Sequence, residues 1–79
     1  MAGNYAELWA AQEQIKPNQK WVNKKHGTTY EVMGVGRRSE PTAQGELLVE
    51  VVHMNENFDI WIRPWKLFLE KFTRLENGQ

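Results

Sequence analysis

The sequence has no cysteine, a single serine and only two histidines among its 79 residues. Without cysteine, neither a disulfide nor a cysteine-ligated zinc ion can stabilise so small a fold. Stability must then come from apolar packing or from association of copies. No apolar run approaches the ~20 residues that cross a bilayer, and the first residues lack a basic segment followed by an apolar one. We therefore expect one domain over residues 1–79, located in the cytoplasm.

Groups suited to catalysis are equally scarce. Ser39 is the only serine. A triad of Ser39, a histidine and Asp59 can be assembled from the residue types present, but no motif around these residues supports it. A metal site built from His26, His53 and Asp59 would lack any recognised ligand spacing. The sequence therefore predicts a protein that binds rather than catalyses, with no cofactor and no metal.

Apolar residues make up 41% of the chain, and they include four Trp, two Tyr and three Phe. From residue 20 onward, short stretches rich in β-branched and aromatic residues recur about every ten residues between turn signals, as in a small all-β barrel. Pro64 ends the fourth stretch, and we expect a 3₁₀ turn between it and the last one. The predicted fold is mainly β, a five-stranded barrel over residues 19–75 with strands at residues 20–24, 29–37, 46–54, 60–63 and 72–75.

Alternation within these strands predicts which side chains point inward. Leu47, Val49 and Val51 fall on the inward face of the third strand, and Ile60 and Ile62 are predicted to face the core from the fourth. His53, at the end of the third strand, is expected to be a half-buried hydrogen-bonding group. The aromatic residues assigned to the core are Trp21, Tyr30, Phe68 and Phe72.

Residues 4–15 have the pattern of a short helix. Asn4 can cap its first turn, and Glu7 stands three residues later in the capping-box position. A helix of about three turns is marginal on its own, so its apolar stripe must pack either on one end of the barrel or on another chain. The residues predicted to lie at such an interface are Tyr5, Leu8, Trp9 and Trp65.

Residues 16–72 also carry the segments of a family pattern. These segments are Tyr30-Glu31-Val32-Met33-Gly34-Val35, then Arg38-Ser39-Glu40, then Trp61-Ile62-Arg63-Pro64 followed by Phe68 and Glu70. In this order and spacing they resemble a small bacterial and phage family catalogued as domain of unknown function 1653. The resemblance implies an SH3-like barrel and a phage or bacterial source, and it implies no activity.

Charge is segregated along the chain although the net charge is zero. Between residues 16 and 38, six basic side chains accompany only Glu31, whereas between residues 40 and 59 five acidic side chains accompany no Lys or Arg. Two oppositely charged patches would favour self-association or a charged partner. Solvated loop charge is the alternative interpretation.

Trp61 and Arg63 form the candidate binding surface. Alternation places them on one side of the fourth strand, opposite the predicted inward isoleucines, and an exposed Trp beside an Arg can stack on a base or bind an anion. The alternative is that Trp61 covers an apolar edge while Arg63 pairs with Glu50 or Glu70. Basic residues of two loops are expected to converge on the same rim, namely Lys24, Lys25, Arg37 and Arg38.

Three functions fit these features. The first is binding of a small anionic or nucleotide-like ligand, for example by a phage protein that sequesters a signalling nucleotide of its host. The second is an adaptor or inhibitor that binds a host protein through the N-terminal helix or the aromatic face, with self-association as a variant. The third, binding of RNA or a single strand, is weakened by the acidic stretch between residues 40 and 59 and by the zero net charge.

Overall fold

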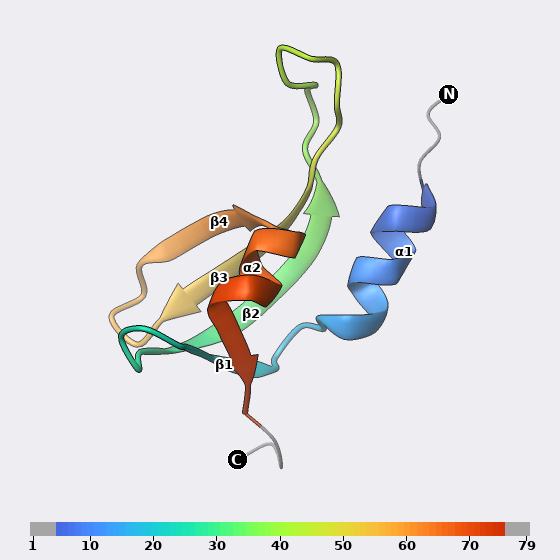
Figure 1. Ribbon diagram of the computed structural model, residues 1–79. Coiled ribbons are helices and arrows are strands. Elements are labelled where there is room, and N and C mark those ends of the chain that lie inside the picture. The colour runs from blue at the N-terminus through green and yellow to red at the C-terminus, as the bar shows by residue number, and fades with distance from the viewer. Residues whose placement is uncertain (1–4, 76–79) are drawn as a thin grey trace.

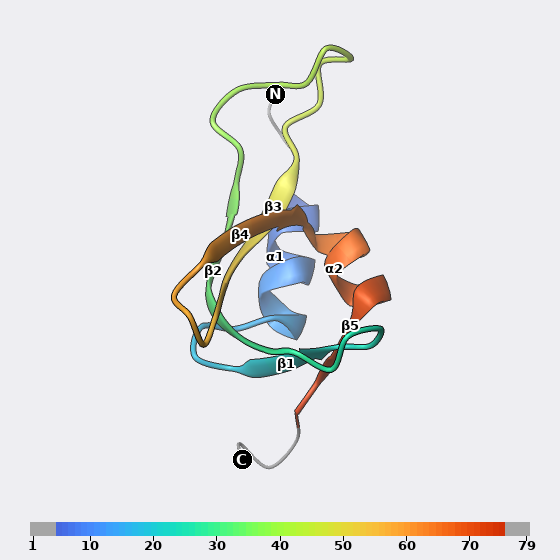
Figure 2. The same cartoon turned by 90° about the vertical axis from the view of Figure 1, so that its left-hand side faces the viewer.

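The chain folds as one strongly curved antiparallel sheet with two short helices packed on its concave side (Figures 1 and 2). The computed structural model describes residues 5–75. The elements are α1 (Tyr5–Gln14), β1 (Lys20–Asn23), β2 (Thr29–Arg37), β3 (Val49–Asn55), β4 (Ile60–Pro64), α2 (Trp65–Lys71) and β5 (Phe72–Arg74). The strand order is β4-β3-β2-β1-β5, with antiparallel pairing throughout. The mainly β fold of five strands is therefore confirmed.

The sheet curls like a barrel but does not close. Within residues 5–75, no strand pairing joins β4 to β5, and α2 spans the gap between these two edges. In Figure 2 the sheet wraps around the interior, with α2 at its open side. No helix in this part of the chain is long and apolar enough to cross a membrane.

The core lies between the concave side of the sheet and the two helices. Val32 and Val51 contribute from the central strands, Ala11 and Ile15 from α1 and the residue that follows it, and Phe68 from α2, and each is at most 1% exposed. Burying a Val, Ile or Phe side chain stabilises a fold by roughly 1.5–3 kcal/mol. The buried residues predicted from the sequence agree for Trp21, Phe68 and Phe72, while Tyr30 packs against the core in a half-buried position. The prediction that Leu47 faces inward is wrong, because β3 begins at Val49 and Leu47, in the loop before it, is 39% exposed.

Two local features adapt the strands to this curvature. The register between β2 and β3 shifts between Val32 and Gly34, so Met33 is the extra residue of a β-bulge. At the β3–β4 hairpin, Phe58 takes a left-handed conformation with φ +68°. The Asn55 side chain holds this turn by accepting hydrogen bonds from the backbone N–H groups of Asn57 (2.9 Å) and Asp59 (3.0 Å).

The two helices differ from expectation in different ways. The predicted helix over residues 4–15 is confirmed as α1, although the proposed cap, Asn4, lies outside the described residues. The expected 3₁₀ turn before the last strand is wrong, because residues 65–71 form an α-helix. All seven residues of α2 are tolerated in helices, and Trp65 and Phe68, one turn apart, are both buried.

Candidate functional site

The structure reverses the predicted orientation of β4. Trp61 lies opposite His53 and Arg63 opposite Val51, and these two β3 residues are fully buried. Residues that lie directly opposite each other in an antiparallel pair share a face. Trp61 and Arg63 are therefore on the concave side, and the prediction that Ile60 and Ile62 face the core is wrong, since they are 57% and 62% exposed.

Arg63 and His53 meet an aromatic cluster on that concave side. The Arg63 guanidinium lies 5.7 Å from the centre of the Phe72 ring, and Arg63 Nε is buried without a hydrogen-bond partner among the described residues. Trp61, on the edge strand, remains 50% exposed. Neither predicted alternative for Arg63 is seen in the ion pairs of the described residues, because Glu50 pairs with Arg38 instead.

His53 is fully buried rather than half-buried. Its Nδ1 lies 3.1 Å from the Val51 carbonyl, which can only accept, so Nδ1 carries the proton and donates. Desolvation by burial lowers the pKa of His53 below its ordinary value of 6.5, the hydrogen bond to Val51 opposes this, and the Arg63 charge lowers the pKa further. His53 is therefore a neutral core residue packed among the rings of Tyr30, Phe68 and Phe72.

The four loop cations do not converge on one rim, contrary to expectation. Lys24 and Lys25 lie in the turn that leads into β2, whereas Arg37 ends this strand and Arg38 follows it. Eight residue steps of extended strand separate the two groups by roughly 25 Å. Arg38 is also engaged, because its Nη2 lies 3.2 Å from a Glu50 carboxylate oxygen.

The predicted interface residues divide between core and surface. Leu8 packs against the core, and Trp65 is buried and donates from Nε1 to Glu7 Oε2 at 3.0 Å. The helix α1 thus packs within its own chain, through Leu8 against the core and through Glu7 against α2. Tyr5 and Trp9 are 48% and 62% exposed and stack on each other with ring centres 5.9 Å apart.

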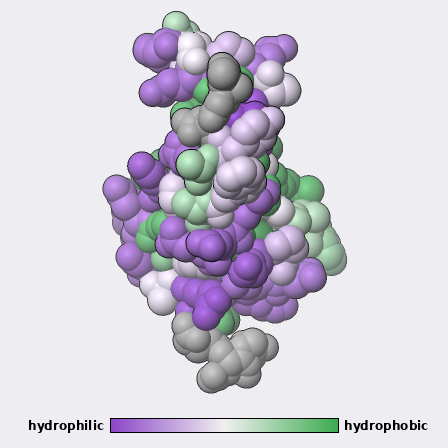
Figure 3. Space-filling model, turned by 90° about the vertical axis from the view of Figure 1, so that its right-hand side faces the viewer, coloured by the Kyte–Doolittle hydropathy of each residue, from purple (hydrophilic) through white to green (hydrophobic). Residues whose placement is uncertain are grey.

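A second exposed apolar surface lies on the convex side of the sheet, and we call it the outer face. It consists of Val52 opposite Ile62, Met54 opposite Ile60, and the bulge residue Met33, which is 48% exposed. Val52 and Met54 are half-buried beneath the two exposed isoleucines. Green side chains gather at the right-hand margin of Figure 3, on the sheet side, while the side of α1 that faces the viewer is mostly purple and pale.

The outer face is open over β2. Gly34 lies opposite Val52 and Gly36 opposite Glu50, so both glycines are on the convex side. A Cβ atom added to either glycine would meet nothing within 4 Å. The absence of side chains there leaves a flat strip beside the apolar residues, which another surface can approach closely.

Charges beside the outer face are paired within the chain. Lys20 Nζ lies 3.7 Å from Glu31 Oε1, and Arg38 pairs with Glu50 on the same side of the sheet. Exposed ion pairs of this kind contribute little to stability. They do leave the surroundings of the outer face without an excess of one charge.

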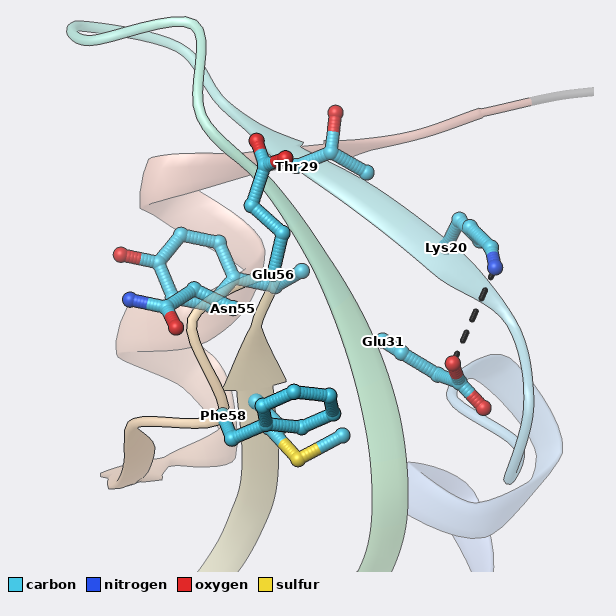
Figure 4. A pocket seen from close by; sticks show the side chains of 8 residues that line it. Lys20, Thr29, Glu31, Asn55, Glu56 and Phe58 are labelled. Atoms are coloured by element: carbon cyan, nitrogen blue, oxygen red, sulfur yellow. Dashed lines mark ion pairs between the residues drawn. The ribbon is translucent and has the colours of Figure 1, made fainter.

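A shallow pocket extends the outer face at its hairpin end (Figure 4). Its volume is about 360 Å³. In Figure 4 the exposed ring of Phe58 stands on one side and the Lys20–Glu31 pair on the other. The lining residues are Lys20, Thr29, Tyr30, Glu31, Met54, Asn55, Glu56 and Phe58. Such a mixed, open pocket can accept one side chain of a partner rather than enclose a small molecule.

Sequence reasoning missed the outer face because it assigned Ile60 and Ile62 to the core. One signal was available, since Val51-Val52 and Ile60-Trp61-Ile62 are apolar on both sides of their strands. A strand that is apolar on both sides must either be covered twice or expose one side. His53 is buried on the concave side, so Trp61, which lies opposite it, is on that side too, and Ile60 and Ile62 are on the convex side. Because histidine is not among the residues most often buried, the sequence did not show which side of the strand faces the core.

The chain matches no family model, no curated protein and no solved structure. The resemblance of residues 16–72 to the bacterial and phage family therefore stays a prediction. The functional interpretation rests on the surfaces described above.

Proposed function

We propose that this chain is a small non-catalytic protein-binding module that docks another protein on its outer face. The observation that carries the proposal is the exposure of three large apolar side chains on one face, Ile60 at 57%, Ile62 at 62% and Met33 at 48%. Scattered apolar residues are normal on a protein surface, but a contiguous apolar patch marks an interaction site. A few residues near the centre of an interface usually carry most of its binding energy.

The chemistry of the outer face favours an apolar, weakly charged partner surface. The neighbouring charges are already paired as Lys20–Glu31 and Arg38–Glu50. The flat strip at Gly34 and Gly36 suits a backbone or a ring that lies against the sheet, and the hairpin pocket beside Phe58 can take one projecting side chain. This is the adaptor or inhibitor function expected from the sequence, with the outer face in place of the N-terminal helix or the aromatic face.

A photo-crosslinking amino acid at Met33 tests this proposal. The matched control carries the same group at Leu47, an exposed residue of the β2–β3 loop that is outside the outer face. In a bacterial lysate, we expect crosslinks to a defined protein from position 33 and none to that protein from position 47. Equal crosslinking from both positions, or none from position 33, would contradict the proposal.

A second candidate function, binding of the small anionic or nucleotide-like ligand expected from the sequence, is supported at a different place. Trp9 stacks on Tyr5, and the Arg37 guanidinium lies 4.5 Å from the centre of the Tyr5 ring. Arg37 Nη1 is buried and has no hydrogen-bond partner among the described residues. An exposed ring beside a cation suits a nucleotide-like ligand. Trp61, Arg63, Lys24 and Lys25 are not part of this cluster, and their role in ligand binding stays a prediction, as do the phage origin and the cytoplasmic location.

A further inference from the structure

The edge strand β4 has exposed side chains on both of its sides, and its outer edge pairs with no strand within residues 5–75. Ile60, Trp61 and Ile62 are 57%, 50% and 62% exposed, and they are consecutive. Proteins usually protect such an edge with lysine, an internal proline or a bulge. β4 has none of these before Pro64, its last residue. The other edge, β5, has only three residues, and two of them are Thr73 and Arg74.

The hydrogen bonds of the hairpin show which backbone groups of β4 are unused. Asn55 N–H donates to the Asp59 carbonyl at 3.1 Å, so residue 59 directs its carbonyl toward β3. In an antiparallel pair this direction alternates along the strand. Trp61 and Arg63 therefore also bond to β3, whereas Ile60 and Ile62 direct their N–H and C=O groups to the free edge.

We propose that a second copy of this chain occupies this edge, with β4 pairing antiparallel to β4 of the other copy around Trp61. In this register Ile60 of each copy faces Ile62 of the other, and the four unused N–H groups of the two copies all find carbonyl acceptors. Trp61 faces its own counterpart, which gives an aromatic pair on the concave side. The contact is isologous and closes as a two-fold dimer.

Charge complementarity selects this register. When Trp61 faces Trp61, Asp59 of each copy lies opposite Arg63 of the other, which places two pairs of opposite charges at the ends of the contact. A shift by two residues removes these charge pairs while leaving the strands antiparallel. Phe58, which is 76% exposed at the hairpin, then falls opposite Pro64 of the other copy. The dimer would have one continuous ten-stranded sheet, and both outer faces would remain on its convex side.

Sedimentation analysis from about 5 µM to about 1 mM tests the dimer on the intact chain. Because a five-residue strand pair is a small interface, we expect a reversible dimer with a dissociation constant of roughly 10–100 µM. Ile62→Pro removes a free-edge N–H without removing a hydrogen bond to β3, and it should abolish the dimer, whereas the matched control Ile62→Val keeps this N–H and should retain it. Amide exchange at Ile60 and Ile62 should slow as concentration rises, while exchange at Trp61 should stay slow throughout.

A second variant keeps the test decisive if Ile62→Pro does not fold. Asp59→Lys places a like charge opposite Arg63 of the other copy, and we expect it to weaken the dimer about fivefold or more. A monomer at the highest concentration, a dimer that survives in folded Ile62→Pro, or Asp59→Lys binding as tightly as the parent chain would each overturn the proposal. The dimer does not require the outer face to bind another protein, so the two can fail separately.

Discussion

At the scale of single residues, the burial of the polar residue His53 fixes which side of β4 faces the core. His53 is fully buried in the middle of β3, and it places Trp61 on the concave side and the two isoleucines of β4 on the convex side. Its Nε2 has no hydrogen-bond partner among the described residues. A buried imidazole is tolerated here because it stays neutral among aromatic rings and donates from Nδ1 to Val51.

The lowered pKa of His53 predicts a stability that depends on pH. Above about pH 6.5 the histidine is neutral in the folded and the unfolded chain. Below that value the unfolded chain takes up a proton before the folded chain does, so the free energy of unfolding falls as pH falls toward the lower folded pKa. Because one proton is involved, the slope cannot exceed about 1.4 kcal/mol per pH unit.

Urea unfolding between about pH 7.5 and about pH 5 measures this slope. The groups that face His53 are the Tyr30 ring from β2, the Arg63 charge from β4, and the uncharged rings of Phe68 and Phe72. His53→Gln should flatten the profile below about pH 6.5. A profile with the same slope in His53→Gln would show that the dependence arises elsewhere.

At the scale of elements, α1 belongs to the fold of the domain rather than to a free interface. Ala11 and Ile15 are 0% and 1% exposed, and the Trp65–Glu7 hydrogen bond joins α2 to α1. The sequence predicted a helix over residues 4–15, and the structure has α1 at Tyr5–Gln14, because the signals that bound a helix are local. The surface it packs on could not be predicted, since docking depends on residues far along the chain.

Ile15→Ala tests this packing. Removing a fully buried isoleucine should lower the free energy of unfolding by about 2–4 kcal/mol. The matched control is Glu13→Ala on the exposed side of α1, which should change it by less than about 0.5 kcal/mol. Chemical unfolding of both variants measures the difference. A cost for Ile15→Ala as small as that of the control would mean that α1 is not docked in solution.

At the scale of the whole molecule, the number of strands and their approximate positions along the chain could be predicted. Which side of a strand faces the core could not be predicted for every strand. Strand β2 matches its predicted limits, because Thr29 and Arg37 are bounded by turn residues. The failure at β4 has a physical cause, since a strand with apolar residues at Ile60, Trp61 and Ile62 gives alternation no contrast to read. The outer face was not predicted for the same reason, and the loop cations were grouped although they lie at opposite ends of β2.

The outer face and the α1 aromatic pair are the two exposed surfaces that compete for the functional role. Met33→Lys alters the first and Trp9→Lys the second, at positions that are 48% and 62% exposed. Exposed substitutions of this kind should change the free energy of unfolding by about 0.5 kcal/mol or less, so both variants should fold.

The most direct measurement is the affinity of the crosslinked partner protein for these two lysine variants and for the parent chain. We predict that Met33→Lys lowers the affinity at least about tenfold, because an ammonium group must lose its water against an apolar surface. Trp9→Lys should bind as the parent chain does. Undiminished binding by Met33→Lys, together with loss of binding by Trp9→Lys, would contradict the outer face as the binding surface.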